Sequence, residues 1–393
     1  MQKRNLKKLH RSHAAKRKKT GFWQSRQFLS LVTIVLIFAA IGLLGAKHLQ
    51  KPSHAAAVDP QIRVECNIDH FAPDDPIVFP GIPGASHMHS FYSNKSTDAS
   101  STPATLAANQ GSCNYIGQYN RSAYWIPSVY FTNPDGSASR FSANSQQLVV
   151  YYRRPGGANG PKVHPFPVGL RMIAGNSKAT SPQNDPNVNW DCGDGGPEYQ
   201  YIPTCTNAQS GNTPVGFVSF PSCWDGVHLD SADHKSHMAY PNATTGVCPA
   251  DHSVSLPRVD FEDWLTGTTG GSNYYLSSGG VYSMHGDVFE NWDPRLQAGL
   301  IDQCLNTVQR DCAPGIFVHT NNDVEVGGTV LFNLNSYPAG QKTGDLNNDG
   351  SVGLVDLSIL LSKWSTNDAT ADLDKNGSVG LTDLSILLSR WGT

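Results

Sequence analysis

Charged residues are scarce in this sequence. Asp, Glu, Lys and Arg make up 16% of its 393 residues, whereas soluble globular domains usually carry about 25%. Uninterrupted helix-forming runs are also scarce, because 37 glycines and 25 prolines are spread along the chain. This composition favours a β-rich core with many loops over a helical bundle. The length exceeds that of one ordinary domain and predicts one large core with an appendage.

Motifs of several common protein classes are absent. The sequence has no nucleophile elbow, phosphate-binding glycine loop or dinucleotide fingerprint, which argues against acyl transfer and nucleotide chemistry. It has no CxxC pair, which argues against a zinc ribbon or a thioredoxin-type site. Residues 1–58 contain 12 Lys and Arg but no acid, so the remainder holds 17 basic and 32 acidic residues, a net charge of −15. This acidic charge of the residues after 58 argues against a nucleic acid partner.

An uncharged segment of 19 residues, 28–46, follows the basic residues 1–27. About 20 apolar residues span a bilayer, and flanking Lys and Arg stay in the cytoplasm. The segment is therefore predicted to be a transmembrane helix or the core of a cleaved signal peptide, followed by a linker over 47–58. The rest of the chain is then expected outside the cell or at its surface.

All eight cysteines lie beyond this hydrophobic segment. Their even number and the oxidising compartment predict four disulfides. Sequence alone leaves the pairing open, with Cys192–Cys205 and Cys304–Cys312 as candidates because they are neighbours in the chain.

Residues 59–338 are predicted to form the core. Runs rich in aromatic and β-branched residues, bounded by Gly, Pro, Asn and Asp, predict strands. These runs span 122–131, 148–152, 216–220, 315–320 and 329–334. One helix is predicted within 293–308. The expected fold is a mainly antiparallel β-sandwich or jelly-roll-like body with long loops.

The C-terminal tail contains a repeat. Residues 344–364 recur as 371–391, an offset of 27 residues. Each copy has oxygen-bearing residues at alternate loop positions, a glycine at position 6 and an Asp at position 12, the spacing of a calcium loop. An apolar i, i+3, i+4, i+7 pattern after each loop predicts a short helix. Two calcium ions are expected, bound by Asp345, Asn347, Asp349, Ser351 and Asp356 in the first loop and by Asp372, Asp374, Asn376, Ser378 and Asp383 in the second.

This tandem loop-and-helix arrangement, over residues 343–393, resembles a type I dockerin. The resemblance implies a cohesin module as partner and attachment of a secreted, usually polysaccharide-degrading enzyme to a scaffold. Loop positions 10 and 11 select the partner in that family. Here they are Leu354-Val355 and Leu381-Thr382, in place of the Ser-Thr pair of the best-known members. The alternative is a calcium-stabilised surface module without a cohesin.

Three core motifs combine histidines with acids: GASHMHSF (84–91), FPSCWDGVHLDSADHKSHMAYP (220–241) and SMHGDVFENWD (283–293). In the first, His87 and His89 are two residues apart and would share one face of a strand. The second also supplies a lysine, Lys235. Such sets of side chains serve as general acids and bases or as metal ligands.

With CPADHSVSLP (248–257), these motifs are similar to the secreted family DUF1996, a domain of unknown function, over about residues 62–320. The resemblance implies an extracellular, disulfide-bearing domain with a carbohydrate-related role. It supplies no catalytic residues that can be carried over.

Three functions are therefore open. The first is hydrolysis of O-glycosyl bonds in an extracellular polysaccharide, which usually needs two carboxyl groups, with a histidine-dependent lyase as a variant. The second is a transition-metal enzyme using His87, His89, His237 and His285. The third is a non-catalytic glycan-binding or adhesin domain. The candidate catalytic residues are His89, Asp225, His237, His285 and Asp287, with Asp230 as a further carboxyl group.

Overall fold

The computed structural model describes residues 60–114, 116–193, 196–206, 212–307, 312, 315–337, 343–346, 352–368 and 370–391. The segment at 28–46 and the linker at 47–58 lie outside these ranges. Within the described ranges, no helix combines the length and the apolar character needed to cross a membrane.

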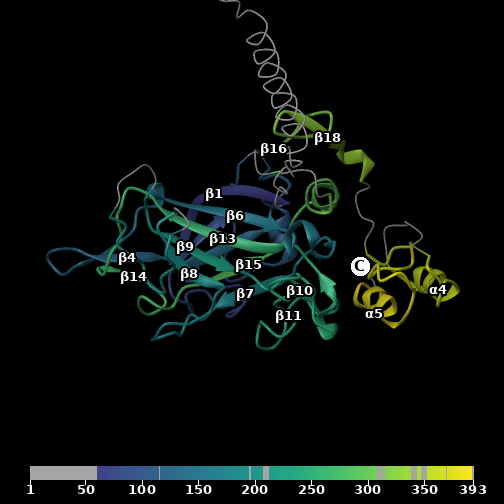
Figure 1. Ribbon diagram of the computed structural model, residues 1–393, viewed down its shortest axis with the longest axis horizontal. Helices are drawn as coiled ribbons and strands as arrows, with labels where there is room; N and C mark the ends of the chain where they lie inside the picture. The colour runs from purple at the N-terminus through teal and green to yellow at the C-terminus, as the bar shows by residue number, and fades with distance from the viewer. Residues whose placement is uncertain are drawn as a thin grey trace, which may run out of the picture. The chain divides into compact units, whose positions relative to one another are not determined.

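One antiparallel sheet of nine strands forms the body of the core (Figure 1). In spatial order the strands are β7 (Arg171–Gly175), β15 (His285–Phe289), β3 (Ala123–Pro127), β2 (His89–Ser93), β1 (Gln61–Ala72), β6 (Gln146–Arg153), β13 (Arg258–Leu265), β9 (Val215–Ser219) and β8 (Val188–Asp191). The strand at one edge, β7, also contacts β9 next to the opposite edge. The sheet therefore curls into a nearly closed cylinder.

The predicted antiparallel β class is confirmed, but the arrangement differs from two stacked sheets. Hydrogen bonding runs without a break from β7 to β8. Strand twist accumulates across so many neighbours and brings the two ends of a single sheet together. The predicted run 122–131 also divides, because β3 belongs to the large sheet whereas β4 (Val129–Thr132) belongs to another.

Three small sheets and a few helices complete the described residues. The sheets are β11 (Met238–Ala239), β10 (Cys223–Trp224) and β12 (Val254–Ser255); β14 (Tyr274–Leu276), β4 and β5 (Ala138–Arg140); and β16 (Ile316–Val318), β17 (Asp323–Val326) and β18 (Thr329–Asn333). The helices are α2 (Pro103–Ala107), α3 (Pro294–Leu300) with the π-helical turn η4 (Ile301–Leu305), and, in the C-terminal module, α4 (Leu354–Ser362) and α5 (Leu381–Ser389). Single 3-10 turns occur at η1 (Ala143–Ser145), η2 (Gly157–Asn159), η3 (Ala250–His252) and η5 (Leu334–Ser336).

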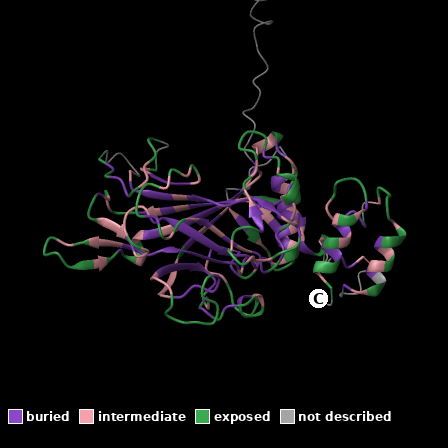
Figure 2. Ribbon diagram, turned by 90° about the horizontal axis from the view of Figure 1, so that it is seen from below, coloured by how far each residue is buried: buried purple, intermediate pink, exposed green. Residues whose placement is uncertain are grey.

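Both faces of part of the large sheet are buried (Figure 2). Inside the cylinder, side chains such as Tyr92, Val150 and Phe261 belong to the main core. On the outer face, Phe91 and Trp125 pack in a second, smaller cluster with residues of the segment between β1 and β3. Consequently all five residues of β2, of β3 and of β15 are buried.

Four disulfides are present, as predicted from the cysteine count: Cys66–Cys113, Cys192–Cys205, Cys223–Cys248 and Cys304–Cys312. Each cysteine pairs with its neighbour in the chain, so both candidate pairings are confirmed. Disulfides of this number indicate an extracellular protein.

We expect removal of the Cys66–Cys113 bridge to lower the free energy of unfolding by about 4 kcal/mol, because it closes a loop of 47 residues. The test is urea unfolding of the Cys66→Ala/Cys113→Ala variant, with Cys192→Ala/Cys205→Ala as the comparison. The latter bridge spans only 13 residues, so its loss should cost less stability. The reverse order would contradict the explanation by loop length.

Two buried acids lie on the inner side of the cylinder. The Asp263 carboxylate accepts hydrogen bonds from Tyr92 (3.1 Å) and from Gln146 (2.8 Å). Burial raises the pKa of Asp263 to about 7 and the pKa of Glu290 to about 8. Both carboxyl groups are therefore held in the protonated form at mildly acidic pH.

Candidate functional site

Two short motifs bring three histidines together on the outer face of the large sheet. His89 begins β2 and His285 begins β15, with β3 between them. His89 pairs with Pro127 of β3, and the β3–β15 register puts His285 at the same level. Side-chain alternation places Asp287 on the face that carries His285. His87, just before β2, completes the group, which we call the histidine cluster (His87, His89 and His285).

The three imidazole rings are in contact distance of one another. Their centroids lie 4.2 Å apart for His87 and His89, 5.0 Å for His87 and His285, and 5.8 Å for His89 and His285. Each ring offers a nitrogen within 4.8 Å of the other two. Metal-to-nitrogen bonds of about 2.0–2.1 Å would need these nitrogens to converge on one common ion. The cluster is therefore a geometrically suitable set of three ligands for one ion.

Hydrogen bonds to backbone carbonyls fix the tautomers of two of these histidines. Nδ1 of His89 lies 2.8 Å from the carbonyl oxygen of Asp74, and Nδ1 of His285 lies 2.8 Å from that of Ser283. A carbonyl can only accept, so Nδ1 carries the proton in both rings. In the neutral ring Nε2 then has a free lone pair, as in most metal-binding histidines.

Polar atoms without partners converge at the cluster. Nε2 of His87 and Nε2 of His89 are buried and have no hydrogen-bond partner among the described residues. Buried polar atoms nearly always have a partner, so an unpaired group in a native structure calls for an explanation such as an ion or a water molecule. A cation bound between the rings would satisfy both nitrogens.

Burial also keeps the cluster uncharged. Desolvation lowers the pKa of His87 to about 4 and the pKa of His285 to about 3. Desolvation lowers the pKa of His89 well below its usual value, and the two neighbouring histidines reinforce this. Neutral imidazole is the form that binds a metal.

Asp287 supplies an acidic group beside the histidines. Its carboxyl group is buried, and its Oδ2 lies 3.9 Å from Nε2 of His285 without a hydrogen-bond partner in the described part of the chain. Burial raises the pKa of Asp287 well above its usual value, and the nearby Asp75 adds to this. Oδ2 is positioned to form a hydrogen bond with a molecule bound at the cluster.

The segment before His87 holds the cluster in place through two aspartates that the sequence interpretation missed. The Asp74 carboxylate accepts hydrogen bonds from the N–H of Gly84 (2.8 Å) and of Ala99 (3.2 Å). The Asp75 carboxylate accepts from Ile77 (2.9 Å) and from the following residue. Two acids preceding Pro76, shortly before HxH, were the only available signal.

A glycine lets β7 approach His285 closely. Gly175 pairs with His285 in the β7–β15 register and has a positive φ of 81°. A Cβ atom there would lie 2.8 Å from Cα of His285 and 2.6 Å from the carbonyl oxygen of Met284, closer than side chains pack. Glycine is therefore needed for this ring to keep its position.

The remaining catalytic candidates line a separate feature, an open hollow of about 590 Å³. We call it the polar hollow; its lining residues are Asp225, His228, Asp230, Ser231, Ala232, Ser236 and His237. The Asp225 carboxylate accepts hydrogen bonds from the backbone N–H groups of Val227 and His228 and lies 2.7 Å from Nδ1 of His228. Asp225 thus organises its own turn.

His237 is not a member of the histidine cluster, although the sequence suggested it as a fourth ligand. Its Nδ1 lies 2.9 Å from the hydroxyl of Ser231, and its Nε2 lies 2.7 Å from the carbonyl oxygen of Arg171. Both ring nitrogens are therefore engaged in fixing the wall of the polar hollow. Asp230 is likewise paired, with Arg171 at 3.2 Å and His234 at 3.0 Å.

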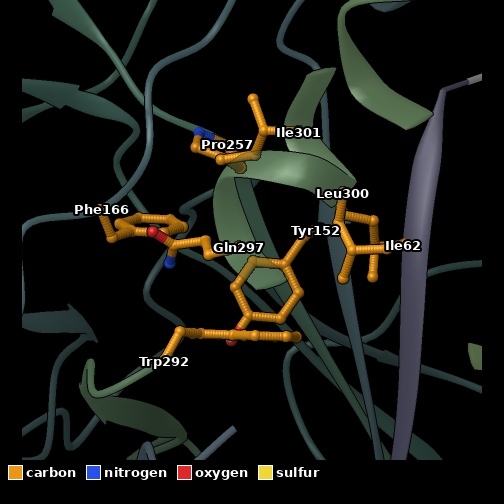
Figure 3. Close-up of a pocket in the computed structure, with 8 residues that line it drawn as sticks. All are labelled: Ile62, Tyr152, Phe166, Pro257, Trp292, Gln297, Leu300 and Ile301. Atoms are coloured by element: carbon orange, nitrogen blue, oxygen red, sulfur yellow. The ribbon is translucent and has the colours of Figure 1, made fainter. Parts of the chain in front are cut away.

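A small apolar pocket beneath α3 is too small to be a ligand site (Figure 3). Its volume is about 10 Å³, the space of about one water molecule. Tyr152 and Trp292 line it with an edge-to-face contact of 5.4 Å between ring centroids. Trp292 also donates a hydrogen bond to the Tyr152 hydroxyl (3.1 Å), so this tryptophan is a core residue.

The C-terminal module brings three predicted calcium ligands together. Carboxylate oxygens of Asp372, Asp374 and Asp383 lie within 4.8 Å of one another. The Asp383 carboxylate also accepts hydrogen bonds from the N–H of Leu373 (2.6 Å) and of Gly380 (2.7 Å), at the start of α5. These bonds tie the end of the loop to its beginning.

Of the other predicted loop ligands, only some lie in the described ranges. Asp345 and Asp356 are buried, and Asp356 accepts a hydrogen bond from the N–H of Leu346 (2.7 Å), as Asp383 does from the equivalent residue. In the second loop Asn376 and Ser378 are described, with a 2.9 Å bond from the Ser378 N–H to the Asn376 side chain. The predicted ligands Asn347, Asp349 and Ser351 lie outside the described residues.

Comparison with protein-family models matches residues 75–292, more than half of the chain, to a domain of unknown function (DUF1996). The matched range contains the whole histidine cluster and Asp287. It ends before the C-terminal module, so the similarity of that module to dockerins stays a prediction. No curated protein and no solved structure matches the chain.

Proposed function

We propose that this chain, which belongs to the DUF1996 family, is an exported metal-dependent hydrolase whose reaction centre is the histidine cluster. The observation that carries the proposal is the convergence of three neutral histidines, two of which have a buried Nε2 atom without a partner among the described residues. Asp74 and Ser283 orient two of the rings through their carbonyl oxygens. Such carbonyl contacts are the usual support of metal-binding histidines.

Three imidazoles suit a divalent transition metal such as zinc. Three protein ligands leave one tetrahedral position open, which is the arrangement of catalytic rather than structural zinc sites. An ion held there would act as a Lewis acid and lower the pKa of a coordinated water. Asp287 Oδ2, 3.9 Å from His285 Nε2, would form a hydrogen bond with that water and orient it.

The proposed substrate is an extracellular polysaccharide, and the proposed reaction is hydrolysis of an O-glycosyl bond. One water is consumed: its oxygen bonds to the sugar carbon and keeps one proton as the new hydroxyl, and its other proton goes to the departing oxygen. Export and the dockerin-like tail support this substrate class. The two-carboxylate mechanism with Asp225 and Asp287 has less support, because Asp225 belongs to the polar hollow and is engaged in its own turn.

The test is release of new reducing ends from a panel of cell-wall polysaccharides by the full chain. Calcium is kept constant, and transition metals are removed by a chelator and then restored one at a time. We expect release only with a restored metal. Release that persists in the metal-free protein would overturn the metal-dependent mechanism, and binding without release under every condition would favour a glycan-binding domain.

For the C-terminal module we propose two calcium ions and a cohesin-type partner. The cluster of Asp372, Asp374 and Asp383 supports the second ion, and the near-identical first loop supports the other. Paired apolar residues on both helices are exposed, with Leu354 and Leu381 each 75% accessible. These residues occupy the loop position that selects the partner in dockerins.

Replacing Asp383 with asparagine is expected to reduce calcium binding from two ions per chain to one. Asp383 closes the second loop, and a neutral amide binds calcium less strongly than a carboxylate. Isothermal titration with calcium gives the stoichiometry, and Asp368→Asn, outside both loops and paired with Lys363, is the control. Two ions retained by Asp383→Asn would contradict the assignment.

A further inference from the structure

A tight turn next to the histidine cluster presents a lysine. The Asp233 carboxylate accepts hydrogen bonds from the backbone N–H of Lys235 (3.1 Å) and of Ser236 (2.9 Å). His234 adopts a left-handed backbone conformation with a φ of 57°. Non-glycine residues seldom adopt that conformation, and it is concentrated at functional sites.

The lysine side chain reaches the strand beside His285. Nζ of Lys235 donates a hydrogen bond to the carbonyl oxygen of Gly175 at 2.7 Å, and Gly175 is paired directly with His285. The positive charge therefore lies one strand spacing from the histidine cluster. Consistent with this, burial is the main cause of the lowered pKa of His285 and the raised pKa of Asp287, and the charge of Lys235 adds to the first shift and partly offsets the second.

Among the described residues, no acid forms an ion pair with Lys235. Asp230 is bound to Arg171 and His234, and Asp233 is bound to its own turn. The bond to Gly175 uses only one of the three N–H donors of the ammonium group. The lysine side chain is exposed, so the other donors are accessible from solvent.

We infer that Lys235 binds an oxyanion substituent of the substrate beside the metal site, so that the substrate of this centre is a negatively charged glycan. The inference rests on the proposed function. A carboxylate of a sugar acid and a phosphate ester share the required chemistry, because both accept hydrogen bonds from an ammonium group. Ser236, the next residue, lines the polar hollow, whose hydroxyl and carboxylate groups suit the neutral hydroxyls of an adjoining sugar.

The experiment uses the full chain loaded with cobalt(II), whose visible spectrum reports ligand binding near the ion. Glucuronate and inorganic phosphate are titrated separately, with glucose as the neutral control. The variants are Lys235→Met, Lys235→Arg and, as a matched loss of an exposed lysine elsewhere, Lys95→Met.

We expect glucuronate, phosphate or both to perturb the spectrum, and glucose to leave it unchanged. Lys235→Met should weaken anion binding about 10- to 100-fold, as for loss of a charge-assisted hydrogen bond, whereas Lys235→Arg and Lys95→Met should retain affinity within about twofold. Which anion responds distinguishes the carboxylate from the phosphate.

The failures are distinguishable. Normal cobalt uptake with unchanged anion affinity in Lys235→Met, or with no anion binding by the unmodified chain, would overturn the role of Lys235 and leave the metal site standing. Absence of cobalt binding by the unmodified chain would overturn the proposed function and this inference with it.

Discussion

Replacing His285 with glutamine is expected to weaken transition-metal binding by more than 100-fold and to abolish metal-dependent product release. His285 is one of only three nitrogen ligands in the cluster, and even partners outside the coordination sphere are worth 10- to 100-fold in metal affinity. The measurement is competition for zinc against a chromophoric chelator at constant calcium, followed by the polysaccharide assay.

The control for this substitution is His319→Gln. His319 is an exposed histidine bound to Glu325 at 2.9 Å and is not part of the cluster. The His319→Gln variant should bind one transition-metal ion with the affinity of the unmodified chain. Equal metal affinity in both variants would show that the cluster is not the metal-binding site. If His285→Gln lost activity but kept the metal, His285 would have a role other than metal ligation.

Deprotonation of Asp263 and Glu290 is expected to lower the free energy of unfolding as pH rises from about 5 to 8. Burial raises the pKa of Asp263 from 3.8 to about 7 and the pKa of Glu290 from 4.5 to about 8. Between the unfolded and folded values the folded state keeps protons that the unfolded state releases. Each carboxyl group then lowers the free energy of unfolding by about 1.4 kcal/mol per pH unit.

The measurement is urea unfolding at pH 5, 6, 7 and 8, with the disulfides intact. The free energy of unfolding of the unmodified chain, relative to that of Asp263→Asn, should fall by about 1.4 kcal/mol per pH unit below pH 7. The buried histidines, whose low pKa values act in the opposite sense in this range, are the same in both proteins and cancel in the comparison. Asparagine keeps a carbonyl acceptor for Tyr92 and Gln146 but does not titrate. The exposed residue Asp302 provides the control substitution Asp302→Asn. A difference between the unmodified chain and Asp263→Asn that does not change with pH would contradict the assignment.

The strands predicted from sequence are those whose residues are mostly aromatic or β-branched. The predicted runs 148–152, 216–220 and 329–334 correspond to β6, β9 and β18, with ends that differ by at most two residues. The helix expected within 293–308 begins at Pro294, capped by the Asp293 side chain, and passes into a π-helical turn. Local signals of this kind need no knowledge of the fold.

The two strands that carry the histidine cluster were not predicted as strands. HSFYS and HGDVF contain polar residues where a strand over a hydrophobic core would have apolar ones. They form strands because the outer face of the sheet is also buried here. That face is apolar except at the histidine cluster. This is where a functional site overrides local pattern.

The composition of the cluster was predicted only in part. The proximity of His87 and His89 followed from their spacing, but the choice of His285 over His237 as the third member depends on the order β2–β3–β15. That order joins residues nearly 200 positions apart in the sequence. No local pattern encodes such a pairing. The group of Asp74 that orients His89 is a backbone carbonyl, so the identity of the side chain gives no indication of it.

In β2 and β15, residues under selection for the histidine cluster alternate with residues under selection for packing of the interior. Odd-numbered positions such as His89, His285 and Asp287 face the cluster, whereas even-numbered positions such as Tyr92 and Val288 face the interior. In a saturation library over these strands, substitutions at odd-numbered positions should therefore reduce metal content. Substitutions at even-numbered positions should reduce expression yield. A lineage could in this way change its metal chemistry by substitutions at alternate residues while its interior packing stays constant.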